Sequence, residues 1–122
     1  MIDAPDDTGD FVAEEWEGTG KQAIGRRLEL TRQVVGLQQN EFCERAGIAT
    51  NAYNQYERGK KRPSLDNAIK LCLTYALTLD WIYLGNDDAL RYSLANAIKA
   101  LKEERLKATP TRASRTRAKS AQ

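Results

Sequence analysis

Two amide side chains, and a run of cations that follows them, are the residues of this sequence best suited to chemistry. Asn51 and Gln55 are four positions apart, so a helix would place both on one side. Asn and Gln each offer a donor and an acceptor, the pattern that the adenine edge requires in the DNA major groove. Four cations follow, where they would neutralise phosphates: Arg58, Lys60, Lys61 and Arg62. Taken alone, the two amides fit a solvated helix face better than base reading. The cations favour a phosphate clamp over a solvated charge run.

Enzyme chemistry has little support in the same sequence. Histidine is absent, and Cys43 and Cys72 lie far apart without a Cys-x-x-Cys spacing, which excludes zinc sites and His-based triads. Both cysteines have apolar neighbours, which favours structural thiols in a reducing compartment over a disulfide or a nucleophile. A phosphate-binding loop is also missing, so we expect no enzyme activity, no metal and no cofactor.

The length of 122 residues fits one compact domain with tails. No apolar run reaches the roughly 18 residues that a membrane span needs. The acidic start also lacks the basic and apolar regions of a signal peptide. We therefore expect a soluble, cytoplasmic protein that does not contact a membrane.

Charge is unevenly distributed behind a formal net charge of +2. Residues 1–20 carry seven acids and no base, residues 21–85 carry ten bases and six acids, and residues 86–122 carry nine bases and four acids. We interpret residues 1–20 as a disordered acidic arm and residues 109–122 as a disordered basic tail. A polyanion would bind the two basic parts. The acidic arm is best interpreted as a solubilising tail. The alternatives are that it competes for the same surface or, through Phe11 and Trp16, binds a protein partner.

Apolar periodicity between the tails predicts an all-α fold with six helices. The first begins directly after a Thr19 cap and ends at about 35, and the others cover about 39–46, 51–58, 65–75, 78–85 and 88–107. Thr19, Ser64 and Thr78 are expected to cap the first, fourth and fifth helices, and Gly47 to end the second. The fourth helix is expected to bury Leu65, Ala68, Ile69 and Cys72.

The sixth helix carries one apolar stripe on a polar surface. Its members are Leu90, Leu94, Ala97, Ile98 and Leu101. Such a stripe has to be buried, and two arrangements would bury it. It would form the interface of a homodimer, or it would pack back on the first and fifth helices as ordinary core.

Six short motifs occur in order along the middle of the chain. They are Ile24-Gly25-x-x-Leu28, Arg32-x-x-x-Gly36-Leu37-x-Gln39, Gly47-Ile48, Tyr56-Glu57-Arg58-Gly59, Pro63-Ser64 and Leu79-Asp80-Trp81-Ile82-x-x-Gly85. Together they resemble the DNA-binding domain of the XRE family of helix-turn-helix regulators, which includes the Cro, lambda and 434 phage repressors. The resemblance covers about half of the chain. It implies a five-helix lambda-repressor-like domain over residues 21–86, with the sixth helix in residues 87–108.

The resemblance also implies roles for individual residues, because the second helix of a helix-turn-helix lies in the major groove. It implies base contacts by Thr50, Asn51, Ala52 and Gln55. It implies phosphate and scaffold contacts by Gln39 and Asn54, beside the phosphate clamp expected from Arg58, Lys60, Lys61 and Arg62. It implies a structural pair between Arg32 and Glu57. Gln38 and Ala49 stand where the family usually has a Ser or Thr cap, so Thr50 is a candidate cap for the third helix.

The function implied by the resemblance is sequence-specific regulation of transcription, most often repression, in a prokaryote or phage. Acting as a homodimer, the chain would bind a near-palindromic operator in double-stranded DNA, with half-sites about 34 to 36 Å apart. The alternative is an antitoxin-type protein that binds a partner protein through the acidic arm and represses its own promoter.

Overall fold

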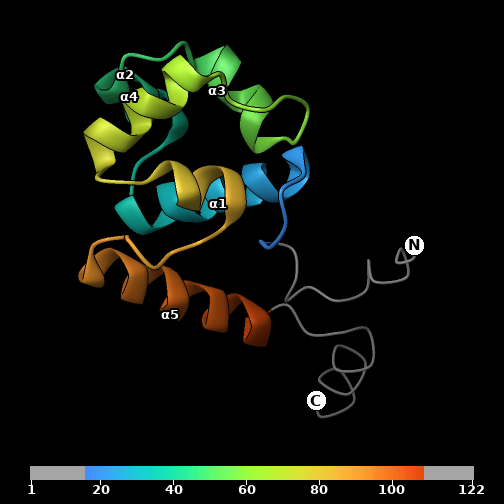
Figure 1. Ribbon diagram of the computed structural model, residues 1–122, viewed down its shortest axis with the longest axis vertical. Coiled ribbons are helices and arrows are strands. Elements are labelled where there is room, and N and C mark those ends of the chain that lie inside the picture. The colour runs from blue at the N-terminus through green and yellow to red at the C-terminus, as the bar shows by residue number, and fades with distance from the viewer. Residues whose placement is uncertain (1–15, 109–122) are drawn as a thin grey trace, which may run out of the picture.

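The computed structural model describes residues 16–108, and within that range the chain is helical and contains no strand (Figure 1). The elements are α1 (Lys21–Val35), α2 (Gln39–Ala46), α3 (Thr50–Glu57), α4 (Leu65–Tyr75), the π-helical segment η3 (Asp80–Leu84) and α5 (Tyr92–Ala108). The expected all-α fold of six helices is confirmed. The predicted disorder of the basic tail, and of the acidic arm up to residue 15, concerns residues outside the described range.

The centre of the fold is α1. It packs against α3, η3 and α5, and Figure 1 shows α5 on one side of α1 with α2, α3 and α4 on the other. Ile24, Leu28 and Leu30 of α1 are fully buried. Because these residues do not share one narrow stripe, α1 has to be covered from more than one direction.

Short polar side chains cap two of the helical elements, as predicted. Ser64 Oγ accepts a hydrogen bond from the Asn67 backbone N–H at 3.1 Å at the start of α4. Thr78 Oγ1 accepts one from the Trp81 backbone N–H at 3.0 Å at the start of η3. These bonds satisfy N–H groups that the first helical turn leaves without a partner.

The predicted start of α1 is wrong in its capping residue. The residue before α1 is Gly20, whose backbone is extended and which makes no side-chain cap hydrogen bond. Thr19 lies one residue too early to cap the helix. The last helix also begins later than predicted, at Tyr92, because residues 87–90 form a turn closed by the Leu90 N–H on Asp87 O at 3.1 Å.

Trp16, which the sequence placed in a disordered acidic arm, lies in the core. Its side chain is 2% exposed. Arg27 Nη1 donates to Trp16 O at 2.6 Å, and Lys102 Nζ of α5 lies 5.8 Å from the Trp16 ring centroid. Burying an aromatic side chain of this size contributes strongly to the free energy of folding. Trp16 is therefore buried although the residues beside it in the sequence are acidic.

Arg27 is a fully buried cation that joins three segments of the chain. Its Nε donates to Trp81 O at 2.9 Å and its Nη2 to Ile82 O at 3.0 Å, in addition to the bond with Trp16. Burial lowers the pKa of Arg27 to about 10, so the side chain is still charged at neutral pH. The carbonyl oxygens replace the water that this charge gives up on folding.

The apolar stripe of the last helix packs against the core of its own chain. Leu90 and Ile98 are 7% and 1% exposed, and Leu94 and Leu101 pack partly buried against the same cluster. Ala97 is exposed. Of the two arrangements expected for the stripe, the structure has the intrachain one, because α5 covers a side of α1 that α3 leaves open. Leu94, Leu101 and Ala97 keep part of their surface, and the dimer interface that the sequence suggested stays a prediction.

The side of α4 that enters the core also differs from the prediction. Ala68 and Leu71 are fully buried, whereas Leu65 and Ile69, expected in the core, are 57% and 40% exposed. Cys72 is half-buried. Apolar residues surround most of α4, so its periodicity did not determine which side would face α2 and the rest of the core.

Candidate nucleic-acid interface

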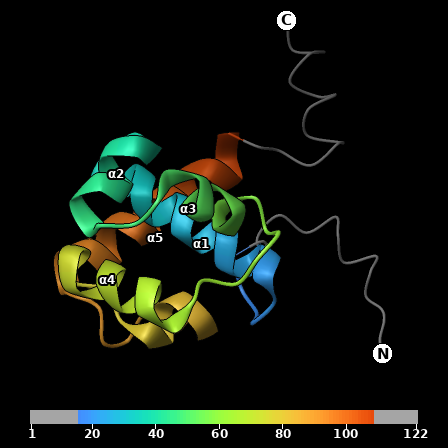
Figure 2. The same cartoon turned by 90° about the horizontal axis from the view of Figure 1, so that it is seen from above.

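The segment α2-turn-α3 has the form of a helix-turn-helix. Gly47 ends α2 with a φ of 76°, a left-handed conformation that glycine adopts without strain. Ile48 follows with 6% exposure and anchors the turn in the core. Figure 2 shows α3 lying over α1, on which it packs. A short turn of this kind fixes the angle between the two helices and so aims α3 outward.

Aromatic residues hold the inner side of α3. Tyr53 is fully buried, and its hydroxyl donates to Leu28 O of α1 at 3.3 Å. Burial raises the pKa of Tyr53 well above its usual value, so this hydroxyl keeps its proton. The ring of Tyr53 lies 5.2 Å from that of Phe42 in α2, and Tyr56 OH accepts from Asn67 Nδ2 of α4 at 2.8 Å. The position of α3 is therefore fixed by three neighbouring helices.

Gly25 allows α1 and the end of α3 to come into backbone contact. A Cβ atom at this position would collide with Tyr56 O and lie 2.8 Å from Glu57 O. Both are backbone oxygens, which cannot move away as a flexible side chain would. Gly25 belongs to a motif that the sequence analysis quoted, but its role in seating α3 depends on a long-range contact that the motif does not show.

The candidate base-contact residues lie on the outer side of α3. Thr50 and Asn51 are exposed, and Ala52 and Gln55 are partly exposed. Asn54, a candidate phosphate contact, is partly exposed as well. Helical geometry separates these five positions from the buried tyrosines. The outer side of α3 is thus polar and open, as a surface that reads base edges has to be.

Two of these residues already have local partners. Asn51 Oδ1 accepts a hydrogen bond from the Ala52 backbone N–H at 2.9 Å. The Asn51 side chain therefore has to rotate before its amide can bind a base through both of its polar atoms. Ala49 occupies the cap position of α3 without a side-chain cap bond, and Thr50 is the first residue of the helix. Burial raises the pKa of the nearby Cys43 thiol, and Thr50 has a smaller, opposing effect on that pKa.

Arg32 of α1 and Glu57 of α3 form a buried ion pair. Arg32 Nε lies 2.7 Å from Glu57 Oε2, and Arg32 Nη2 donates to Glu57 Oε1 at 3.2 Å. Gln39 Nε2 of α2 donates to the same Oε1 at 2.8 Å, and Arg32 Nη1 donates to Leu37 O at 2.9 Å. The hydrogen bond with Glu57 raises the pKa of Arg32. The network joins α1, α2 and α3, and it uses the amide of Gln39 that the sequence assigned to a phosphate.

The cationic loop lies directly beyond α3. Arg58, Lys60, Lys61 and Arg62 are all exposed. The Lys60 and Lys61 backbone N–H groups donate to Gln55 O at 2.9 and 3.3 Å, which holds the loop against the helix end. Arg62 Nη1 donates to Thr19 O at 2.6 Å, so this cation also binds the chain ahead of α1.

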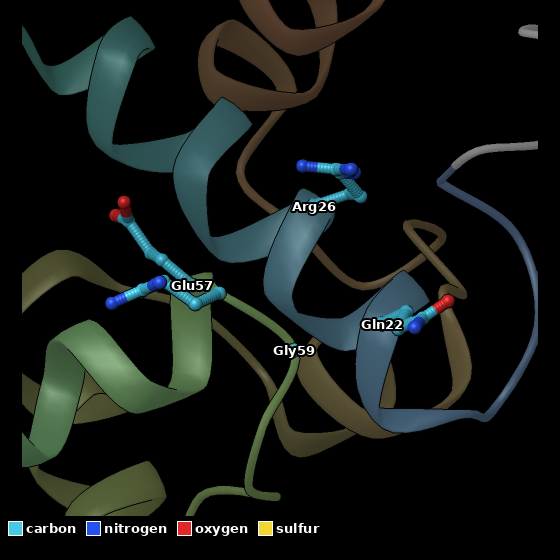
Figure 3. Close-up of a pocket in the computed structure, with 5 residues that line it drawn as sticks. Gln22, Arg26, Glu57 and Gly59 are labelled. Carbon is cyan, nitrogen blue, oxygen red and sulfur yellow. The ribbon is translucent and has the colours of Figure 1, made fainter.

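Arg26 of α1 is a cation near this surface that the sequence analysis did not single out. It lines a pocket of about 120 Å³ between the start of α1 and the end of α3, together with Gln22, Glu57, Arg58 and Gly59. Figure 3 shows Arg26 and Gln22 on α1, with Gly59 just past the end of α3. Arg26 is two residues from both Ile24 and Leu28, which are buried, so the helix places it on the opposite, polar side of α1. Its exposure could have been predicted from this spacing.

Other kinds of site have less support in the described part of the chain. Within residues 16–108 no group of acidic, cysteine or histidine side chains is arranged to hold a metal ion. No helix in that range is long and apolar enough to cross a lipid bilayer. Cys43 and Cys72 are free thiols, and burial raises the pKa of both, so neither is an activated nucleophile.

Comparison with known proteins agrees with this geometry. The helix-turn-helix family model matches residues 28–82. The HTH-type transcriptional regulator ImmR of Bacillus subtilis (strain 168) is 33% identical in an alignment of 90 residues that covers 67% of this chain and 70% of that protein. The uncharacterized HTH-type transcriptional regulator YobD of the same strain is 33% identical over 63 residues, 52% of this chain and 56% of that protein. No solved structure matches significantly. The chain belongs to the XRE-type helix-turn-helix family of transcriptional regulators.

Proposed function

We propose that this chain is a sequence-specific DNA-binding repressor that places α3 in the major groove of a near-palindromic operator and acts as a homodimer. The observation that carries the proposal is the outer side of α3, which is polar and open while its inner side is fixed on α1, α2 and α4. A groove about 12 Å wide admits one such helix.

The base contacts proposed are those of the outer side of α3. Asn51 and Gln55 carry amides that pair with adenine through two hydrogen bonds, worth about 1 to 3 kcal/mol of discrimination each when the geometry is good. Thr50 and Ala52 present a methyl group each, which fits the thymine methyl group.

The phosphate contacts proposed flank α3 on two sides. Lys60, Lys61 and Arg58 of the exposed loop clamp one strand, with Arg62 and Asn54 beside them. On the other side, α2 begins at Gln39 after Gln38, which makes no side-chain cap bond, so we assign the Gln39 and Asn40 backbone N–H groups to a phosphate. Since the Gln39 amide binds Glu57, its proposed role is to hold this helix end in place while the backbone meets the phosphate.

We infer repression and dimerisation from the small number of base pairs that α3 of one copy can contact. One recognition helix contacts only a few base pairs, whereas two copies related by a two-fold axis read two half-sites on one face of the duplex. Occupying an operator that overlaps a promoter excludes the polymerase, so DNA binding by this domain is sufficient for repression.

The antitoxin-type alternative is less favoured by the structure. It required an acidic arm in which Phe11 and Trp16 bind a partner, but Trp16 is buried in the core and its backbone binds Arg27. Phe11 lies outside the described residues. Six acids remain in residues 1–15, and their effect on DNA affinity can be measured directly.

The proposal is tested by footprinting on the region upstream of the chain's own gene. Wild type should protect two symmetric half-sites centred about 34 to 36 Å apart. The variant Asn51→Ala/Gln55→Ala should lose this protection at the same protein concentration. Asn96→Ala removes an exposed amide from α5, far from α3 in sequence, and is the matched control that should retain protection. Equal loss in both variants would contradict the role given to α3.

A further inference from the structure

We propose that the pocket between the start of α1 and the end of α3 binds one phosphate group of the DNA backbone, which Arg26 and Arg58 hold together. The proposal rests on the proposed function and deepens it, because it adds α1 to the surface that contacts DNA. Figure 3 shows the two sides of the pocket, with Arg26 and Gln22 on α1 and Gly59 just past the end of α3.

The size of the pocket limits what it can hold. Its volume is about 120 Å³. Pockets for drug-sized ligands measure about 300 to 1,000 Å³, so this one accepts only a group of a few heavy atoms. A Cβ atom at Gly59 would lie 2.9 Å from Gln22 Cγ, so the space stays open because position 59 carries no side chain. We therefore expect a small ion or a projecting group of a larger molecule.

The side chains around the pocket favour a negatively charged group. Arg26 lies on the α1 side and Arg58 on the α3 side, and both are exposed. A guanidinium stays charged and carries five N–H donors in one plane, which suits the oxygens of a phosphate. Gln22 adds an amide donor on the same side of α1 as Arg26, because the two residues are four positions apart.

Glu57, an acid that also lines the pocket, is already neutralised by its partners. Its Oε2 lies 2.7 Å from Arg32 Nε, and its Oε1 accepts from Gln39 Nε2 at 2.8 Å. Figure 3 shows the Glu57 carboxylate directed away from Gln22. Glu57 therefore offsets little of the positive charge that the two arginines bring to the pocket.

The start of α1 adds to this positive potential. The helix begins at Lys21, next to Gln22, and Gly20 before it makes no side-chain cap hydrogen bond. The N–H groups of a first helical turn carry a partial positive charge of about half an elementary charge, which favours an anion nearby. The helix end thus reinforces the two arginines, which remain the main attraction.

The position of the pocket favours DNA as the source of the phosphate. Arg58 and Gly59 line the pocket, and the exposed Lys60 and Lys61 of the cationic loop follow them directly. Phosphates of one DNA strand follow one another at a rise of about 3.4 Å. A strand that the loop clamps therefore presents a neighbouring phosphate beside the pocket. A free phosphate ion has the same chemistry, and the experiments below separate the two sources.

A double-mutant cycle on random duplex DNA tests whether the two arginines hold the same phosphate. Arg26→Gln and Arg58→Gln should each weaken binding about fivefold, as the loss of one exposed charge contact does. The double variant should also lose about fivefold rather than about 25-fold, because the first substitution already releases the phosphate. Its salt slope of log K should fall by about one unit and not by two.

Lys61 supplies the matched control, because it is an exposed cation that does not line the pocket. Arg26→Gln/Lys61→Ala should lose about 25-fold, the product of two independent losses. Thermal unfolding should be unchanged in every variant, since all three side chains are exposed. Unchanged DNA affinity of Arg26→Gln, or a loss of about 25-fold in Arg26→Gln/Arg58→Gln, would refute the shared phosphate. Random DNA contains no operator, so this failure would leave base reading by α3 untouched, and failure of base reading would leave the cycle interpretable.

Titration with inorganic phosphate, followed by NMR shifts of the Gln22 and Gly59 amides, separates DNA from a free ion. The ion should bind only weakly, in the millimolar range, because it lacks the neighbouring contacts that tether a DNA phosphate. The shifts should be lost in Arg26→Gln/Arg58→Gln. Micromolar binding of the ion, with the DNA affinity of Arg26→Gln unchanged, would assign the pocket to a free ion and overturn the proposal.

Discussion

Replacing Arg32 with methionine should destabilise the domain severely, because it leaves Glu57 as a buried carboxylate without its cation. Glu57 is 8% exposed, and its two oxygens receive two of their contacts from Arg32, at 2.7 and 3.2 Å. The Gln39 amide would remain, but it carries no charge. Removing one partner of a buried ion pair typically costs about 3 to 5 kcal/mol. For a domain of this size that corresponds to a fall in Tm of more than about 12 °C.

Two further variants separate this explanation from a general effect of losing an arginine. In Arg32→Met/Glu57→Leu both charges are gone, so much of the stability should return, because apolar side chains of similar volume often replace a buried pair without loss. Arg45→Met removes the cation of an ion pair with Glu41 whose side chains are 56% and 51% exposed, and it should cost less than about 0.5 kcal/mol. Urea and thermal unfolding measure all three. A loss below about 1 kcal/mol for Arg32→Met, or a double variant no more stable than the single one, would refute the reasoning.

Three other predictions concern the packing of α3 on α1, the cationic loop beyond α3 and the acidic residues 1–15. Gly25→Ala should destabilise by about 1 to 3 kcal/mol, measured by urea unfolding, since the new Cβ meets backbone oxygens, whereas Gly20→Ala, with no atom within 4 Å, should change little. Lys61→Ala should weaken operator and random DNA equally and lower the salt slope of log K by about one unit, unlike Lys99→Ala on α5; a base-specific loss would contradict this. Deleting residues 1–15 removes six acids but keeps the buried Trp16, so affinity for random DNA in a fluorescence titration should rise; unchanged affinity would argue against competition by the acidic arm.

Local signals in the sequence predicted most of the helical framework. The bounds of α2 and α4 and the caps at Ser64 and Thr78 agree with the structure, because each depends on residues within one helical turn. Gly47 behaves likewise, since a left-handed helix end is a property of a single residue. The outer side of α3 could be predicted for the same reason: the buried tyrosines define the inner side.

Features that depend on contacts between distant segments could not be predicted in this way. Trp16 stands in an acidic segment with few apolar residues, and its buried position is set by contacts with Arg27 and with Lys102 of the last helix. Apolar residues surround α4, so periodicity alone could not show that Leu65 and Ile69 would face outward. In each case the outcome depends on which neighbouring element covers which side, information that a single sequence carries only indirectly.

Selection of binding sites from a random DNA library tests the central claim, that α3 reads sequence, most directly. Wild type should enrich one motif with two symmetric half-sites. Gln55→Ala should enrich the same motif with the preference lost at a single position in each half-site, because only that base loses its partner, at about 1 to 3 kcal/mol. If wild type enriches no motif, or Gln55→Ala enriches an identical one, then Gln55 and the outer side of α3 do not read bases.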